Sequence, residues 1–198
     1  YEQKAFDAFV RGKPDKYCSP GAARDLAMAA YQRAIELAGL PWCDNLIGVG
    51  VSCSLMKENE REGREHHAYI AVQTARETYT LCLETGDMKF GLRHLQEMYV
   101  AKRIIEMLAI ACGVTTAAKR EIQPQVKQAN DHTYAVVVGK SKTASYDIAG
   151  KRYVEEPLSD RVIFPGSFNP WHDGHARMAE KAFAMTGKPV DLEITVRN

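Results

Sequence analysis

Residues 161–175 decide the second half of the fold: Arg161-Val-Ile-Phe-Pro-Gly-Ser-Phe-Asn-Pro-Trp-His-Asp-Gly-His175. The apolar run 162–164 predicts a strand that stops at Pro165-Gly166, and an amphipathic helix is expected to open at about Asp173. Backbone N–H groups and the helix dipole point outward at such a helix start, so this order predicts an anion site. His172 and His175 at its mouth can add donors to phosphate oxygens.

Residues 166–175 follow the pattern G-[SG]-F-[ND]-P-x-H-x-G-H at every position, including its HxGH motif. The segment therefore resembles the nucleotidyltransferase superfamily, which includes the cytidylyltransferases and the nicotinate- and nicotinamide-mononucleotide adenylyltransferases. The resemblance implies a Rossmann-like fold whose first βαβ unit spans residues 161–198. It also implies transfer of a nucleotidyl group from CTP or ATP to a phosphorylated acceptor, such as a nicotinamide or nicotinate mononucleotide, with Mg²⁺ bridging the phosphates.

The same resemblance suggests roles for individual residues. The catalytic residues would be His172 and His175, which would contact the triphosphate and stabilise the transition state. The nucleotide-binding residues would be Gly166, Ser167 and Phe168, which line the phosphate pocket, and Gly174, where a Cβ would crowd the nucleotide.

Two other interpretations of the histidine pair stay open. A His-x-x-His pair on one helical turn can bind zinc, but no cysteine or third histidine lies near it in the sequence to complete a zinc shell, so no metal ligands are expected. Two exposed surface histidines beside a turn are also common.

Length and composition indicate a globular chain of one full domain and part of another. The chain has 198 residues, 45% hydrophobic and 26% charged, with a formal net charge of +1. That balance argues against a nucleic-acid partner, and no apolar run approaches the roughly 20 residues of a membrane span. The five widely spaced cysteines indicate reduced core residues, hence a reducing compartment: the cytoplasm or an organelle matrix.

The first unit is expected over residues 1–114 as a layered α/β domain. Ser19 and Pro20 predict the start of a helix over 21–37 that stops at Gly39. A short strand over 45–51 follows, and the alternation of 67–74 and 77–84 predicts two strands joined by a tight turn. The last element is a long helix over 90–111.

Four pieces of this unit resemble the C-terminal domain of the CinA family, whose bacterial members include nicotinamide-mononucleotide amidases. They are residues 17–27, 46–52 and 65–74, and the last long helix. The resemblance implies a three-layer CinA-like domain, and eukaryotic proteins join such a domain to a nucleotidyltransferase in this order.

Two departures predict that this CinA-like domain is catalytically silent. The A-E-S-C-T-G-G segment that supplies the family's nucleophilic serine is absent, and the glycine-rich loop is replaced by Ser-Cys-Ser-Leu-Met-Lys-Glu-Asn-Glu-Arg-Glu-Gly over 52–63. Bulky side chains there exclude close backbone approach to a phosphate. Ser52 and Ser54 are expected to be ordinary hydroxyls. His66 and His67 should point to opposite faces of a strand.

Residues 115–160 are expected to be a linker in which Tyr134-Ala-Val-Val-Val138 forms an isolated strand. Because the sequence starts at Tyr1 and stops after one βαβ unit, we expect a fragment of a longer protein, lacking its N-terminus and inactive alone. The favoured function is that of a nucleotidyltransferase. The alternative is a catalytically inactive structural or interaction subunit of a larger assembly, organellar or cytoplasmic. A protein partner or a second copy of the chain is expected in either case.

Overall fold

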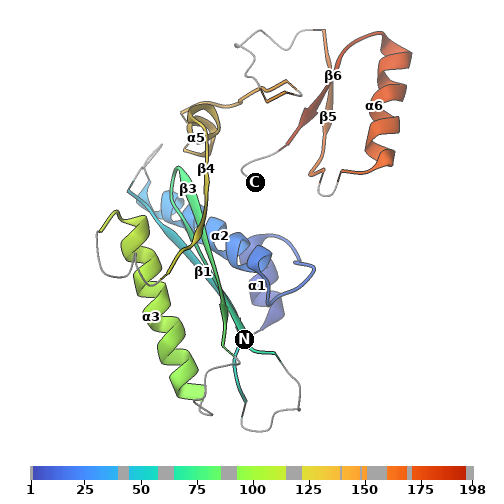
Figure 1. Cartoon of the computed structure of the whole chain (residues 1–198). Coiled ribbons are helices and arrows are strands. Elements are labelled where there is room, and N and C mark those ends of the chain that lie inside the picture. Colours follow the sequence, from blue (N-terminus) through green and yellow to red (C-terminus); the bar gives the residue numbers. More distant parts are fainter. Residues whose placement is uncertain are drawn as a thin grey trace. The chain divides into compact units, whose positions relative to one another are not determined.

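The computed structural model describes residues 2–39, 45–57, 65–85, 93–114, 122–138, 140–147, 149–150, 160–168 and 171–194. The chain divides into unit 1, residues 1–140, and unit 2, residues 141–198 (Figure 1). Unit 1 contains α1 (Gln3–Val10), α2 (Pro20–Ala38), β1 (Gly48–Ser54), β2 (His67–Gln73), β3 (Glu77–Glu84), α3 (Arg93–Ala111), β4 (Gln125–Gln128) and α5 (Asp131–Val137). Unit 2 contains β5 (Val162–Pro165), α6 (Asp173–Thr186) and β6 (Val190–Glu193).

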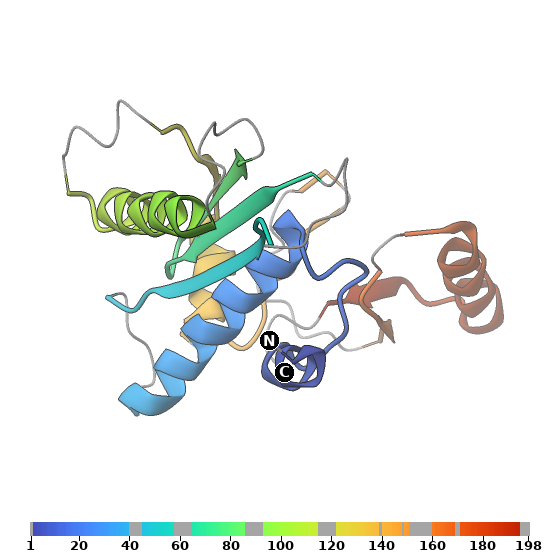
Figure 2. The same cartoon turned by 90° about the horizontal axis from the view of Figure 1, so that it is seen from below.

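Unit 1 is a three-layer structure around an antiparallel sheet with the order β1-β2-β3-β4. Helix α3 covers one face of the sheet and α2 the other (Figure 2). Strand β2 serves both layers, because successive side chains of a strand point to opposite faces. Ile70 lies in the core cluster with Met107 of α3, whereas its neighbour Ala71 lies with Ala23 and Ala27 of α2.

Helix α2 begins and ends where its sequence signals predicted. Ser19 is the N-cap, and its hydroxyl oxygen accepts a hydrogen bond from the Ala22 N–H at 3.1 Å. Pro20 occupies the first turn, and Gly39 ends the helix in the left-handed conformation with φ +63°. The predicted pair of strands after the Ser52 loop is also confirmed as β2 and β3, whereas β1 starts three residues later than expected.

Two glycines of β1 let α2 approach the sheet closely. A Cβ added to Gly50 would lie 2.1 Å from the Ala23 carbonyl oxygen and 2.5 Å from the Ala27 nitrogen. A Cβ on Gly48 would lie 2.0 Å from the Ala27 carbonyl oxygen. Because these neighbours are helix backbone, which cannot rotate away, no side chain fits at either position.

The prediction of a strand over residues 134–138 is wrong, since Asp131–Val137 forms the helix α5. Its start is fixed by Asn130, whose side-chain oxygen accepts from the Thr133 N–H at 2.9 Å. Tyr134 and Val138, four residues apart, lie on one helical face and are buried with Tyr31 of α2. The capping signal and this tertiary contact outweigh the β propensity of the three consecutive valines.

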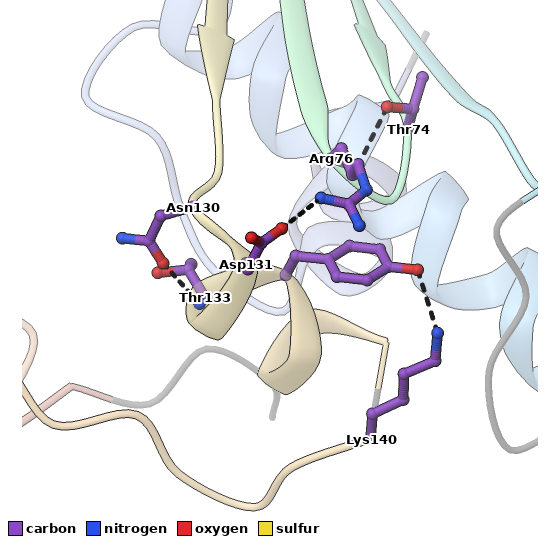
Figure 3. Close-up of polar contacts among 7 residues, drawn as sticks. Thr74, Arg76, Asn130, Asp131, Thr133 and Lys140 are labelled. Carbon is purple, nitrogen blue, oxygen red and sulfur yellow. Dashed lines mark hydrogen bonds and ion pairs between the residues drawn. The ribbon is translucent and has the colours of Figure 1, made fainter. Parts of the chain in front are cut away.

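An ion pair and a stacked cation fasten α5 to the turn between β2 and β3 (Figure 3). The Arg76 guanidinium lies 3.9 Å from the centre of the Tyr134 ring and donates to the Asp131 carboxylate at 2.8 Å. The hydrogen bond to Arg76, and then its charge, hold the pKa of Asp131 below its usual value. On the other side, the Lys140 ammonium donates to the Tyr134 hydroxyl at 3.3 Å.

The segment expected as a linker is thus structured over its described first half. Strand β4 pairs antiparallel with β3, from Glu77 opposite Gln128 to Thr80 opposite Gln125. Together with α5 it belongs to unit 1. All four residues of β4 are exposed, so the strand lacks the alternating pattern by which it could have been predicted.

Unit 2 is a strand–helix–strand unit with parallel strands. β5 and β6 pair in register from Val162 opposite Val190 to Pro165 opposite Glu193, and α6 connects them. This is the order expected from the sequence, although a Rossmann-like sheet would need further parallel strands and stays a prediction. Arg161 locks the start of β5 to β6 through two bonds to the Asp191 carboxylate, at 2.5 and 2.7 Å.

Helix length and cysteine exposure bear on the expected cellular compartment. Across the described ranges no helix is long and apolar enough to cross a membrane. Among the described cysteines, Cys53, Cys82 and Cys112 are exposed rather than buried in the core as expected. Cys43 lies outside the described residues.

Replacing Gly50 with alanine should destabilise unit 1 strongly. The new methyl group would force β1 and α2 apart, and overpacking of this kind costs about 1–3 kcal/mol or more. Gly12→Ala is the matched control, because a Cβ there meets nothing within 4 Å. Urea unfolding followed by circular dichroism should show a lowered midpoint for Gly50→Ala only. Equal midpoints for the two variants would contradict the close approach.

Removing the cap of α5 should have a smaller effect. Asn130→Ala should lower the free energy of unfolding by about 1 kcal/mol, whereas Asn130→Asp should keep it close to wild type, since aspartate caps equally well. Thermal unfolding of the two variants measures the difference. An alanine variant as stable as the aspartate variant would show that tertiary packing alone sets the start of α5.

Candidate functional site

The candidate site is the turn from β5 into α6, which contains most of the predicted motif. The structure describes Gly166, Ser167 and Phe168 and then residues 171–175; Asn169 and Pro170 lie outside the described residues. Gly166 directly follows β5, and α6 starts at Asp173. The parallel pairing of β5 with β6 fixes the strand end from which this turn departs.

The two motif histidines close the N-terminus of α6 as a reciprocal capping pair. His172 is the N-cap residue, and its Nδ1 accepts a hydrogen bond from the Gly174 N–H at 3.1 Å. His175 returns the interaction, since its Nδ1 accepts from the His172 N–H at 3.4 Å. The two imidazole rings stack with their centres 3.7 Å apart. The structure therefore brings together the two side chains that the sequence singled out, with His172 just before the helix and His175 in its first turn.

This capping determines which ring nitrogen of each histidine faces away from the helix. A nitrogen can accept a hydrogen bond only through its lone pair, so a neutral imidazole that accepts at Nδ1 has its proton on Nε2. Both rings thus keep an Nε2–H donor that is not used by the cap. Two N–H donors on rings stacked 3.7 Å apart are suited to neighbouring oxygens of one phosphate chain.

Aromatic rings fix the position of His175. The edge of the Phe168 ring meets His175 with centres 5.2 Å apart, and Phe164 of β5 packs edge-on against Phe168, also at 5.2 Å. Phe168 has a φ of +48°, in the left-handed region that side chains rarely adopt. A Cβ on Gly166 would lie 2.9 Å from the Phe168 ring, so glycine is needed at 166 for the ring to turn back over the loop.

Gly166 and Gly174, two of the expected nucleotide-binding residues, have structural roles within unit 2. The Gly166 N–H donates to the Glu193 carbonyl oxygen at 3.0 Å and so extends the β5–β6 pairing instead of facing a ligand. Within the described part of the chain, the N–H groups of Ser167 and Phe168 have no acceptor, and these two remain candidates for phosphate contact. At Gly174 an added Cβ would lie 2.9 Å from the His172 ring, so this glycine makes room for the capping imidazole itself.

Sequence reasoning missed Trp171 as a member of this group. Its ring centre lies 5.7 Å from that of Phe168 and 5.4 Å from that of His175. The recurrence of aromatic residues at 164, 168 and 171, on both sides of the loop, was the signal that could have suggested a cluster.

Neither Ser52 nor Cys53, at the end of β1, is activated as a nucleophile by its described surroundings. The Ser52 hydroxyl donates to the Tyr17 carbonyl oxygen, so its proton is directed to backbone rather than to a base. Cys53 is exposed, yet partial desolvation by the surrounding protein, together with the nearby Cys18, raises the pKa of its thiol and disfavours the thiolate. Residues 58–63 of the predicted loop lie outside the described residues.

The two histidines near this loop have separate environments, as predicted. His66 is buried, whereas His67 is half-exposed, pairs with the Glu65 carboxylate at 3.1 Å and stacks on Tyr69 with ring centres 6.0 Å apart. Among the described residues, no hydrogen bond joins either histidine to the Ser52 hydroxyl.

Comparison with known proteins gives a match that lies in unit 2. Residues 163–195 match the family described as Cytidylyltransferase-like, and this stretch contains β5 from Ile163 onward, the histidine turn, α6 and β6. No curated protein and no solved structure gave a match. The family match supports a nucleotidyltransferase-related function for this segment, and the resemblance of unit 1 to CinA stays a prediction.

We expect the chain to release no ammonia from nicotinamide mononucleotide. The physical reasons are the Ser52 proton held by backbone and the raised pKa of the Cys53 thiol. A coupled ammonia assay on the purified chain, with a boiled sample as the blank, measures this directly. Release above the blank that disappears in Ser52→Ala would show that the loop retains a working nucleophile.

Proposed function

We propose that unit 2 is the triphosphate-binding part of a nucleotidyltransferase. Its reaction would transfer a nucleotidyl group from CTP or ATP to a phosphorylated acceptor, with a nicotinamide or nicotinate mononucleotide as the favoured acceptor. The observation that carries this proposal is the stacked His172–His175 pair at the start of α6, within a segment that matches the cytidylyltransferase-like family.

The chemistry needs stabilisation of negative charge more than it needs a base. A phosphate oxygen of the acceptor attacks the α-phosphorus of the nucleoside triphosphate, the bond to the α–β bridging oxygen breaks, and pyrophosphate leaves. The acceptor oxygen is already ionised at neutral pH, so no proton must be removed. Charge grows on the oxygens around the α-phosphorus and on the leaving pyrophosphate, where donors held in advance lower the barrier.

The described residues supply such donors from two directions. The Nε2–H groups of His172 and His175 come from the helix start, and the backbone N–H groups of Ser167 and Phe168 come from the loop. Both histidines are held by backbone hydrogen bonds and ring contacts, so little reorganisation is needed when the phosphates bind.

Mg²⁺ would enter with the nucleotide as part of the substrate. Among the described residues no group of three or more His, Cys, Asp or Glu side chains could hold a metal ion. Asp173 is the one carboxylate within residues 166–175. Phosphate oxygens and water would supply most of the ligands, and the ion would offset the phosphate charge.

The second candidate is an interaction subunit without catalytic activity, which the surface of unit 2 favours. Helix α6 has no buried residue, and Met178, Phe183 and Met185 expose 59%, 54% and 75% of their surface. Leu192 of β6 is 44% exposed as well. An apolar surface of this kind suits a protein partner or a second copy of the chain.

Turnover of the His175→Ala variant separates the two candidates. In the intact protein we expect nucleotidyl transfer to fall on the order of 10²–10³-fold, the usual cost of one lost donor at such a site. Pyrophosphate release from CTP or ATP in the presence of the mononucleotide measures the rate. Lys181→Ala, on an exposed position of the same helix, is the control and should keep the wild-type rate.

His172→Asn separates catalysis from capping. Asparagine can cap α6 but has no donor at the place of the imidazole Nε2. Its melting temperature should stay near wild type while the rate falls as in His175→Ala. Wild-type turnover in both histidine variants would favour the interaction subunit.

A further inference from the structure

One part of the Trp171 side chain packs against neighbouring rings, and the rest is exposed to solvent. Phe168 and His175 contact the indole, tilted by 49° and 34° to it, while Phe168 in turn packs on Phe164 of β5. Nevertheless, 48% of Trp171 is exposed. A tryptophan that served only to complete the aromatic cluster would be expected to bury most of its large ring.

The exposed indole lies next to His172 and His175, the two histidines whose N–H groups would bind phosphate. Its ring centre is 5.4 Å from that of His175, which in turn stacks on His172 at 3.7 Å. A flat π surface beside a pair of N–H donors matches the two chemical parts of a nucleotide, which are a planar heterocycle and a charged phosphate chain. Inorganic polyphosphate has only the second part.

The position of Trp171 within the motif supports a role in choosing the ligand. It occupies one of the two open positions of the pattern, directly before the capping histidine. Its ring can therefore differ without loss of the caps formed by His172 and His175. The packed Phe168 and His175 rings restrict its rotation, so little side-chain freedom is lost when a ligand stacks on it.

We propose that Trp171 is the stacking platform for the heterocycle of a nucleotide whose phosphates are held by His172 and His175. This inference rests on the proposed function of unit 2. The heterocycle belongs either to the donor triphosphate or to the acceptor mononucleotide, since both share the planar ring and the phosphate. Stacking on one aromatic side chain typically strengthens binding about tenfold.

Fluorescence of Trp171 tests the proposal directly. The chain has two tryptophans, so Trp42→Phe leaves Trp171 as the only indole. CTP, ATP, nicotinamide mononucleotide and inorganic tripolyphosphate are titrated separately. We expect at least one of the three nucleotides to quench the emission, while tripolyphosphate binds with little quenching. The nucleotide that quenches identifies whether donor or acceptor occupies the platform.

Affinity measurements on Trp171 variants then separate stacking from phosphate binding. By calorimetry, Trp171→Ala should raise the Kd of the nucleotide that quenches the emission about tenfold and leave the Kd of tripolyphosphate unchanged. Trp171→Phe should retain most of the nucleotide affinity. Circular dichroism of each variant checks that α6 stays folded. Equal nucleotide affinity in Trp171→Ala and wild type, or an equal loss for nucleotide and tripolyphosphate, would overturn the platform.

The two proposals fail in different ways in this experiment. If tripolyphosphate binds and His172→Ala abolishes its binding, the phosphate site stands whatever Trp171 does. If wild-type protein binds neither tripolyphosphate nor any nucleotide, the proposed function falls and the platform falls with it.

Discussion

The arrangement of unit 2 depends on an unusual choice of helix cap. Helices commonly start at Ser, Thr, Asp or Asn, whose short side chains turn back onto the backbone and leave nothing beyond them. Here two imidazoles do the same with one ring nitrogen and keep the other at the far side of a rigid ring. His172 thereby starts the helix and also keeps a donor on the ring nitrogen that the cap does not use. Gly174 leaves room for the His172 imidazole, and Gly166 leaves room for the Phe168 ring that packs on His175.

Ring contacts also hold the described side chains of the site in place before any ligand binds. Phe164, Phe168, Trp171 and His175 form a continuous chain of ring contacts from β5 to α6. Such contacts add about 0.5–1.5 kcal/mol per pair beyond burial. Much of the conformational entropy of the donor side chains is therefore lost already on folding, and phosphate binding need not offset that loss.

Sequence reasoning succeeded where local chemistry decides the outcome and failed where distant contacts do. Ser19 and Gly39 marked the ends of α2, and the alternation of β2 and β3 marked the sheet, because caps and periodicity act within a few residues. Three valines predicted a strand at α5, whose helix depends on Tyr31, some hundred residues earlier, and on Arg76. At the site, the motif identified both histidines, but the contact of Trp171 with His175 depends on how the loop turns. The role of the Gly166 N–H depends on Glu193 in the following strand.

The glycines of β1 also bear on how unit 1 finds its native pairing. In the observed register, Gly48 and Gly50 face the backbone of α2, and Val49 and Val51 face the opposite layer. Sliding the strand by one residue would exchange these faces and drive two valines into a space that does not admit even a methyl group. A shifted register of β1 is thus excluded, because its valine side chains would collide with the backbone of α2. Gly48 and Gly50 thus fix the register of β1 in the sheet, although neither residue has a side chain that could pack.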